Sequence, residues 1–161
     1  MAAAGQVMTT SIVSLGARPD LVSTVASWLW REWGRHKGRT IEMVTDRLTA
    51  PLTAPGFEQT FARLSGDIPV ATASLVNADL DARPDLSPWL AGVFVDPPFR
   101  GQGHAAALVR AVEDAARARG VGTLWLHTEH AAGLYAGLGW EAIGPEMDHQ
   151  FAVTLMRRVW E

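Results

Sequence analysis

The sequence predicts an α/β protein of the α+β type, with about seven strands and about four helices in one domain. Short apolar runs bounded by glycine, proline and polar residues predict the strands. Longer stretches in which apolar residues recur every three or four positions predict the helices. The third observation is size: 161 residues suit one domain with a sizeable core. Residues 1–161 are therefore taken as that domain, with residues 1–5 as a flexible tail.

The chain opens with a predicted strand and helix. Residues 7–15 alternate loosely between apolar and polar side chains, which indicates a strand. Pro19 suits the first turn of a helix, and apolar residues at helical spacing continue this helix to about Gly34. Residues 34–39 form a basic loop that we expect to be solvated. Three tryptophans of the helix either pack in the core, the commoner role, or line a pocket: Trp28, Trp30 and Trp33.

A second helix and a hairpin follow. Thr40 suits the N-cap of the helix, and Pro51 and Pro55 are expected to end it, because proline lacks the backbone N–H. Residues 57–64 and Ile68–Val76 predict two strands, joined by a tight turn at residues 65–67. Residues 77–88 are mostly polar and predict a connection.

The most informative stretch combines a strand, a glycine turn and a helix. Trp89–Val95 is short and mostly apolar, which predicts a buried strand. Residues 100–105 read Arg-Gly-Gln-Gly-His-Ala and run directly into a helix that ends near Gly120. The apolar face of that helix is predicted to hold Ala105, Leu108, Val109, Val112 and Ala116. Glu113 is expected on the opposite face, spaced to pair with Arg117.

The last third of the chain predicts three strands and one helix. Residues 123–127 form a candidate buried strand, and residues 131–138 a short helix. Residues 140–143 and 150–159 predict the two final strands. Residues 144–150 are expected to connect them as a loop.

The glycine turn predicts an anion-binding site. The first backbone N–H groups of a helix have no partner within the helix, and the helix dipole places partial positive charge there. Gly101 and Gly103 lack Cβ atoms, so a phosphate can approach the main chain closely. Arg100 adds a charge that can bind phosphate oxygens in a fork. The alternative is an ordinary strand-to-helix turn with an exposed arginine.

Two motifs resemble those of the GCN5-related N-acetyltransferases, the GNAT superfamily. Arg100, Gly103 and Ala105 match its motif Gln/Arg-x-x-Gly-x-Gly/Ala, and residues 134–140 resemble its segment Leu-Tyr-x-x-x-Gly-Phe/Trp. The resemblance is clear over about residues 57–145. It implies a mixed, mostly antiparallel sheet whose fourth and fifth strands splay apart, with acetyl-CoA bound in the splay.

The resemblance also implies roles for particular residues. Main-chain groups of three strand residues would pair with the pantetheine arm: Val93, Phe94 and Val95. Backbone N–H groups of the turn would hold the pyrophosphate, with Arg100 assisting: Gly101, Gln102, Gly103, His104 and Ala105. The His104 side chain is expected to point to solvent. Thr128 could bind CoA through its hydroxyl, and Tyr135 would be the general acid that protonates the leaving thiolate, with an ordinary phenol pKa near ~10.

This sequence departs from the family pattern at the general base. Many members carry a glutamate in the fourth strand where this chain has Ala91, and many have an asparagine where it has Thr128. The base is therefore unassigned. Six polar residues are candidates, with Glu129 and His130 preferred for their proximity to Thr128: His127, Glu129, His130, Asp85, Asp148 and His149. We expect no metal site, because the acidic and histidine residues near the fifth strand are too few and too crowded.

Composition limits the remaining possibilities. A net charge of −3 gives no basic surface for nucleic acid, and no apolar run is long enough to span a membrane, so a cytoplasmic protein is expected. The absence of cysteine excludes an acyl-cysteine intermediate and favours direct transfer. The sequence thus predicts an acetyl-CoA-dependent N-acetyltransferase, monomeric or homodimeric. Its acceptor would be a primary amine of a small molecule or of a peptide. The alternative is a CoA-binding sensor or partner module without turnover.

Overall fold

The computed structural model describes residues 9–161 and confirms the predicted fold class. Residues 1–5, and the first two residues of the strand predicted at 7–15, lie outside this range. The seven strands of the described range are β1 Thr10–Ser14, β2 Gln59–Ser65, β3 Ile68–Val76, β4 Trp89–Val95, β5 Thr123–Thr128, β6 Glu141–Asp148 and β7 Phe151–Val159. The helices are α1 Val22–Glu32, α2 Ile41–Thr53, α3 His104–Ala118 and α4 Ala132–Gly137. Residues 9–161 also contain the short 3₁₀ helices η1 Pro19–Leu21, η2 Gly34–Lys37 and η3 Pro97–Phe99.

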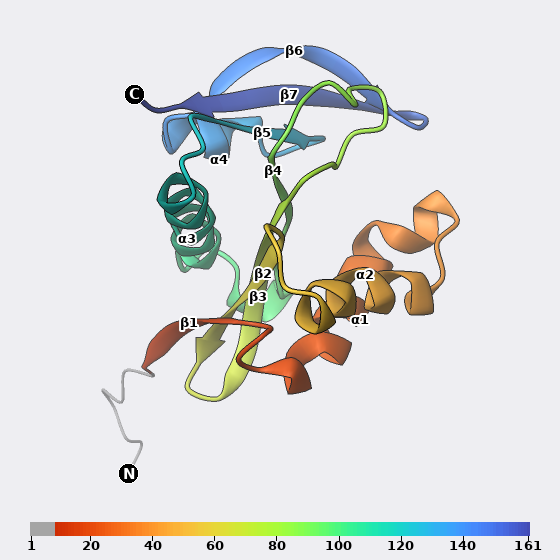
Figure 1. Cartoon of the computed structure of the whole chain (residues 1–161), viewed down its shortest axis with the longest axis vertical. Helices are drawn as coiled ribbons and strands as arrows, with labels where there is room; N and C mark the ends of the chain where they lie inside the picture. Colours follow the sequence, from red (N-terminus) through yellow and green to blue (C-terminus); the bar gives the residue numbers. More distant parts are fainter. Residues whose placement is uncertain (1–8) are drawn as a thin grey trace.

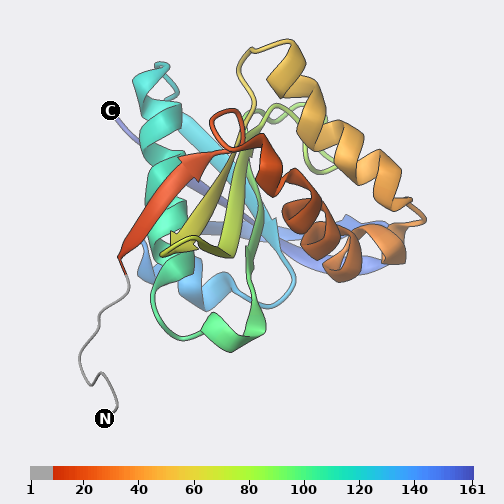
Figure 2. The same cartoon turned by 90° about the horizontal axis from the view of Figure 1, so that it is seen from below.

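The strands form one mixed sheet in the order β1-β2-β3-β4-β5-β7-β6. Every neighbouring pair is antiparallel except β4 and β5, which run parallel. Helix α3 lies on one side of the sheet, and α1 and α2 lie on the other (Figure 2). The apolar stripe of α3 packs on the sheet as predicted, and its core residues are Leu108, Val109, Val112 and Ala116. A second core cluster joins α1 and α2 to β1 and β2.

The sheet splits between β4 and β5. Within the described residues their pairing consists of Trp89 opposite Trp125, at the start of β4. Beyond this point the two strands diverge (Figure 1). A bulge in β4 accompanies the divergence, because its register with β3 shifts between Thr72 and Ser74, and Gly92 has a φ of 61°. One edge of β4 is therefore not covered by β5.

Two element boundaries differ from the sequence prediction. Helix α2 continues through Pro51 to Thr53, so Pro51 does not end it. The missing N–H of this proline removes only one hydrogen bond close to the end of the helix. Strand β6 extends to Asp148, although residues 144–150 were expected to form a loop. Pro145 is tolerated because β6 is an edge strand, where one N–H of each pair of residues faces away from the sheet.

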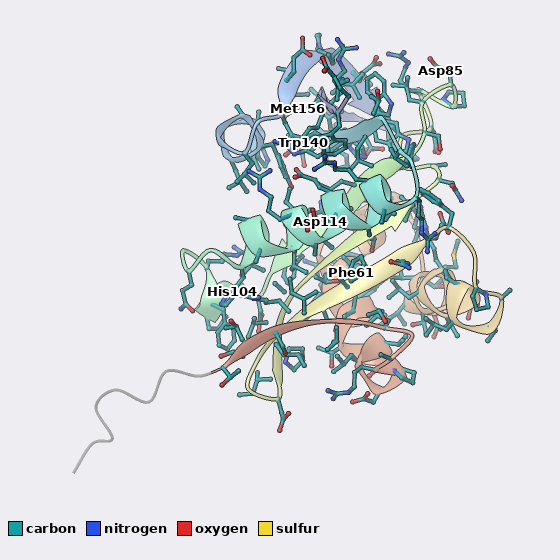
Figure 3. All side chains as sticks on the ribbon, turned by 60° about the vertical axis from the view of Figure 1, so that its left-hand side comes forward. Phe61, Asp85, His104, Asp114, Trp140 and Met156 are labelled. Carbon is teal, nitrogen blue, oxygen red and sulfur yellow. The ribbon has the colours of Figure 1, made fainter. Side chains whose placement is uncertain are left out.

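Glu113 also differs from the prediction, because its side chain is buried. It does not pair with Arg117. Instead it accepts hydrogen bonds from Arg110 Nη1 at 2.8 Å and from Trp140 Nε1 at 3.0 Å. Arg117 lies over the ring of Trp160. Figure 3 shows Trp140 on the far side of α3 from Phe61 of β2. This polar cluster therefore belongs to the packing of α3 against the C-terminal strands.

Candidate functional site

A cleft of about 770 Å³ lies where the sheet splits. Residues from α1, η2 and α2 line one part of it, and most of the other lining residues come from the sheet and from α4. Five acidic residues line it, Glu32, Glu58, Asp79, Glu129 and Asp148, together with three lysines or arginines, Lys37, Arg39 and Arg47. Its volume falls in the range of small-ligand sites.

The free edge of β4 leads from the cleft toward the glycine turn. Gly92 and Val93 line the cleft, while Phe94 and Val95 continue the strand beyond it. Phe94 packs against Trp28 with ring centroids 5.7 Å apart, which fixes this end of β4 against α1. Val95 O accepts a hydrogen bond of 2.9 Å from Arg100 Nε. The main chain of β4 is therefore open to a ligand at Val93, whereas the carbonyl of Val95 already accepts a hydrogen bond from Arg100.

The glycine turn has the geometry of an anion site. Gly101 and Gly103 have φ values of 76° and 84°, which favour glycine, and Gly103 is the N-cap of α3. A Cβ atom added to either glycine would meet no described atom within 4 Å. The space beside the backbone of Gly101, Gln102 and Gly103 is thus open, and the first amides of α3, at His104 and Ala105, follow directly. None of these five residues lines the cleft, so the turn forms a separate part of the site.

The His104 side chain does not point to solvent, contrary to the prediction. It is only 6% exposed, and its Nδ1 lies 3.4 Å from Arg63 Nε. Its Nε2 is buried without a hydrogen-bond partner among the residues that the structure describes. The side chain is held under the start of α3, so any contact of His104 with an anion at the turn falls to its backbone N–H.

Tyr135 lies in α4 and faces the cleft. Burial raises the pKa of its phenol to about 12, so the unperturbed value expected from the sequence is wrong. The ring of Trp140 packs edge-on against it, with centroids 6.3 Å apart. Thr128 also lines the cleft, and its Oγ1 accepts the backbone N–H of Ala131 at 3.0 Å. The hydroxyl proton of Thr128 remains available to a ligand.

The structure separates the six candidate bases into two groups. Four of the candidates line the cleft: His127, Glu129, His130 and Asp148. Ala91 lines it too. Asp85 and His149 do not line it; Asp85 instead pairs with Arg83 at 2.9 Å. Among the four, His130 has an 88% exposed side chain, whereas His127 Nε2 lies 2.9 Å from Asp79 Oδ2.

Sequence reasoning missed an ion pair that spans the cleft. Lys37 Nζ in η2 lies 2.6 Å from Asp148 Oδ2 at the end of β6, and both side chains are almost fully buried. The prediction of a solvated basic loop is therefore wrong for Lys37. The three tryptophans of the first helix have different roles: Trp28 packs in the core, Trp33 lines the cleft, and Trp30 Nε1 donates to Arg39 O.

Residues 9–161 contain no group of three or more His, Asp or Glu side chains placed to hold a metal ion. None of their helices has both the length and the apolar character needed to cross a membrane.

Comparisons with known proteins concern the family and the fold. The family model "Acetyltransferase (GNAT) family" matches residues 22–140. An aminoglycoside 6'-N-acetyltransferase solved with coenzyme A has a TM-score of 0.73 at 15% identity, over 92% of this chain and 96% of that chain. An acetyltransferase from Streptococcus agalactiae has a TM-score of 0.70 at 16% identity, over 97% of this chain and 100% of that one.

A spermidine N-acetyltransferase chimera from Vibrio cholerae is also similar, with a TM-score of 0.70 at 13% identity, over 93% of this chain and 95% of that chain. Comparison with curated protein sequences gave no match. At these identities the structural similarity concerns the fold, while the family model covers most of the chain and places it by sequence. The chain belongs to the GNAT family of acetyltransferases.

Proposed function

We propose that this protein transfers the acetyl group of acetyl-CoA directly to a primary amine of a small molecule. One observation carries the proposal. Val93 on the free edge of β4 and Tyr135 line the cleft where the sheet splits, and the open glycine turn follows the end of β4. Acetyl-CoA needs three corresponding contacts, to its diphosphate, its pantetheine arm and its thioester. The residues present fit each of them.

Most of the proposed cofactor-binding residues would act through their main chain, and Arg100 and Thr128 through their side chains. The N–H groups of residues 101–105 would bind the diphosphate, because the first N–H groups of α3 have no partner within the helix and the two glycines leave space for it. Arg100 would add charge through the guanidinium nitrogens that do not contact Val95. Main-chain groups of Val93 and Phe94, and the backbone N–H of Val95, whose carbonyl already accepts from Arg100, would pair with the amides of pantetheine. Thr128 would donate its hydroxyl proton.

Tyr135 would protonate the sulfur as the thiolate leaves. Its phenol holds its proton at neutral pH, since its pKa is raised to about 12 by burial. A high pKa keeps the group protonated and ready to donate, although it lowers its strength as an acid. Direct transfer then needs no covalent intermediate on the protein, and the chain contains no cysteine that could form one.

The charges of the cleft support an amine acceptor. Its five acidic side chains exceed its three lysines and arginines, so the cleft favours a cation. The cleft volume suits a small molecule better than a folded protein surface. Structural neighbours include aminoglycoside and spermidine acetyltransferases, which is why amines with several charges are sensible first acceptors to test.

The test is release of free CoA thiol from acetyl-CoA in the presence of single amines. The panel contains a polyamine, an aminoglycoside, an amino acid and a peptide with a free N-terminus, with a no-amine reaction as background. We expect thiol release above background with the polyamine or the aminoglycoside, and mass spectrometry should find one acetyl group on the acceptor. If CoA binds but no amine releases thiol, the protein is instead a CoA-binding module without turnover.

A further inference from the structure

The pairing of β4 with β5 places Ala91 and His127 at equivalent positions along the two strands. Trp89 of β4 is paired with Trp125 of the parallel strand β5. Two residues further along each strand stand Ala91 and His127, and both line the cleft. Because side chains alternate along a strand, these residues share a face with Trp89 and Trp125, which join one apolar cluster. His127 therefore lies across the split from Ala91, on the same face of the sheet.

This position matters because Ala91 cannot accept a proton. A methyl side chain has no acid–base chemistry, and Ala91 stands where the GNAT resemblance leads us to expect a glutamate on the fourth strand. The imidazole of His127 reaches the same face of the same cleft from the neighbouring strand. The function that β4 lacks can thus be supplied by β5.

The surroundings of His127 fit a base rather than a free surface histidine. Its side chain is 12% exposed, its Nε2 lies 2.9 Å from Asp79 Oδ2, and its ring packs edge-on against Trp89 with centroids 6.0 Å apart. Asp79 belongs to the connection between β3 and β4, so two separate parts of the chain hold the imidazole. A carboxylate on one ring nitrogen fixes the proton there and leaves the other nitrogen, Nδ1, as the acceptor.

Charges from three elements act on His127. Burial alone would lower its pKa, but the hydrogen bond and the charge of Asp79 raise it, and Asp148 at the end of β6 adds to the rise. Lys37 of η2 opposes them. The net result is a pKa above the ordinary value of 6.5, which makes the imidazole a stronger base.

We infer that His127, oriented by Asp79, is the general base that deprotonates the acceptor amine, directly or through one water molecule. This inference rests on the proposed function. Nδ1 of His127 takes one proton from the ammonium, and the free amine attacks the thioester carbonyl, forming the C–N bond. As the C–S bond breaks, Tyr135 protonates the sulfur. The nitrogen of the acceptor then gives its second proton to the Tyr135 phenolate, which restores the phenol. His127 releases its proton to solvent, so each turnover yields one amide, one thiol and one proton.

The other histidine that lines the cleft near β5 lacks such support. His130 is 88% exposed, and its Nε2 is 3.9 Å from Glu129 Oε1, too far for a hydrogen bond. An exposed imidazole without a fixed orientation keeps no defined nitrogen toward the acceptor. The structure therefore favours His127, oriented by Asp79, as the base in place of His130 and Glu129, which the sequence favoured.

The test compares kcat/KM against pH for the wild-type protein and for His127→Gln, Asp79→Asn and the control Asp67→Asn. Asp67 is an exposed residue in the turn between β2 and β3, and it lies outside the cleft lining. We expect His127→Gln to lose about 100-fold or more in kcat/KM and to lose the acidic limb of the profile, with an unchanged Kd for CoA. Asp79→Asn should move that limb to lower pH, and the control should stay within about twofold of wild type.

A second readout does not depend on turnover. Proton NMR titration of His127 without any ligand should give a pKa above 6.5 in the wild-type protein and a lower value in Asp79→Asn. If circular dichroism shows that His127→Gln does not fold, the shift of the acidic limb of the kcat/KM profile in Asp79→Asn decides whether His127 is the base. An active wild type with an unaltered acidic limb in Asp79→Asn, or a folded His127→Gln with nearly full activity, overturns this inference alone. A wild type that binds CoA and acetylates no amine overturns the proposed function and this inference with it.

Discussion

Trp140 Nε1 donates a hydrogen bond of 3.0 Å to Oε2 of Glu113, and both side chains are buried. Glu113 lies in α3, whereas Trp140 immediately precedes β6. The indole ring of Trp140 also packs edge-on against Tyr135. One buried carboxylate thus connects the helix that starts at the glycine turn to the aromatic ring that supports the proposed general acid.

The Glu113–Trp140 contact predicts a specific loss of stability. Trp140→Phe removes the indole N–H and leaves Glu113 with one donor fewer in a buried position, so the free energy of unfolding should fall by about 1–3 kcal/mol. Urea denaturation measures this. The matched control is Trp160→Phe, which keeps an aromatic ring beside Arg117 and Arg158 and should cost less than about 1 kcal/mol. Equal losses in the two variants would contradict the role of the hydrogen bond.

Tyr135→Phe tests the proposed general acid. The variant removes only the hydroxyl, so kcat should fall by about 100-fold, the low end for a general acid, because a thiolate is a good leaving group. The Kd for CoA should change little, since the proposed binding groups belong to other residues. Steady-state kinetics and calorimetry measure the two quantities. Unchanged kcat, with chemistry shown to be rate-limiting, would remove Tyr135 from the mechanism.

The raised pKa of Tyr135 can be measured directly, because it is the single tyrosine of the chain. Ultraviolet absorbance titration of the folded protein should show ionisation near pH 12, and the unfolded chain in denaturant should ionise near 10.0. The folded state holds the proton more tightly. Its contribution to stability is therefore complete at pH values below the pKa of the unfolded chain, and it is lost as the pH rises toward the pKa of the folded protein. A midpoint near that of the unfolded chain, while circular dichroism still reports the native fold, would contradict the burial of the phenol.

The Lys37–Asp148 pair predicts coupling between the two walls of the cleft. Lys37→Met leaves the buried Asp148 carboxylate without its cation, which should lower the free energy of unfolding by about 3 kcal/mol. Arg157→Met is the matched control, because it breaks a more exposed pair with Glu141 and should cost less than about 1 kcal/mol. Chemical denaturation gives both values. A loss from Lys37→Met no larger than that of the control would show that the pair does not hold the cleft together.

Local signals in the sequence predicted most of the fold. Trp89–Val95 is apolar, short and followed by two prolines, and the structure contains a strand with the same bounds. The glycine turn and the periodic face of α3 depend on neighbouring residues, so both could be read directly. The splay between β4 and β5 came from the family resemblance, and the structure agrees with it.

The errors concern residues whose environment is set by distant parts of the chain. Glu113 was assigned to the solvent face because helical spacing cannot reveal Trp140, which lies 27 positions away. Lys37 and Asp148 are separated by 111 positions, so no local pattern joins them. His127 could be named as one of six candidate bases, but its contact with Asp79 requires the connection before β4 to fold back over β5.

The most direct measurement is an NMR titration of isotope-labelled protein with CoA, following the backbone amide signals. We expect the amide signals of Gly101, Gly103, His104 and Ala105 to shift most, together with that of Val93, because these groups are proposed to bind the diphosphate and the pantetheine arm. A truncated ligand that lacks the nucleotide and diphosphate should leave the signals of the turn unshifted. Binding of CoA without movement of the signals from residues 101–105, or no binding at all, would contradict the proposed CoA site.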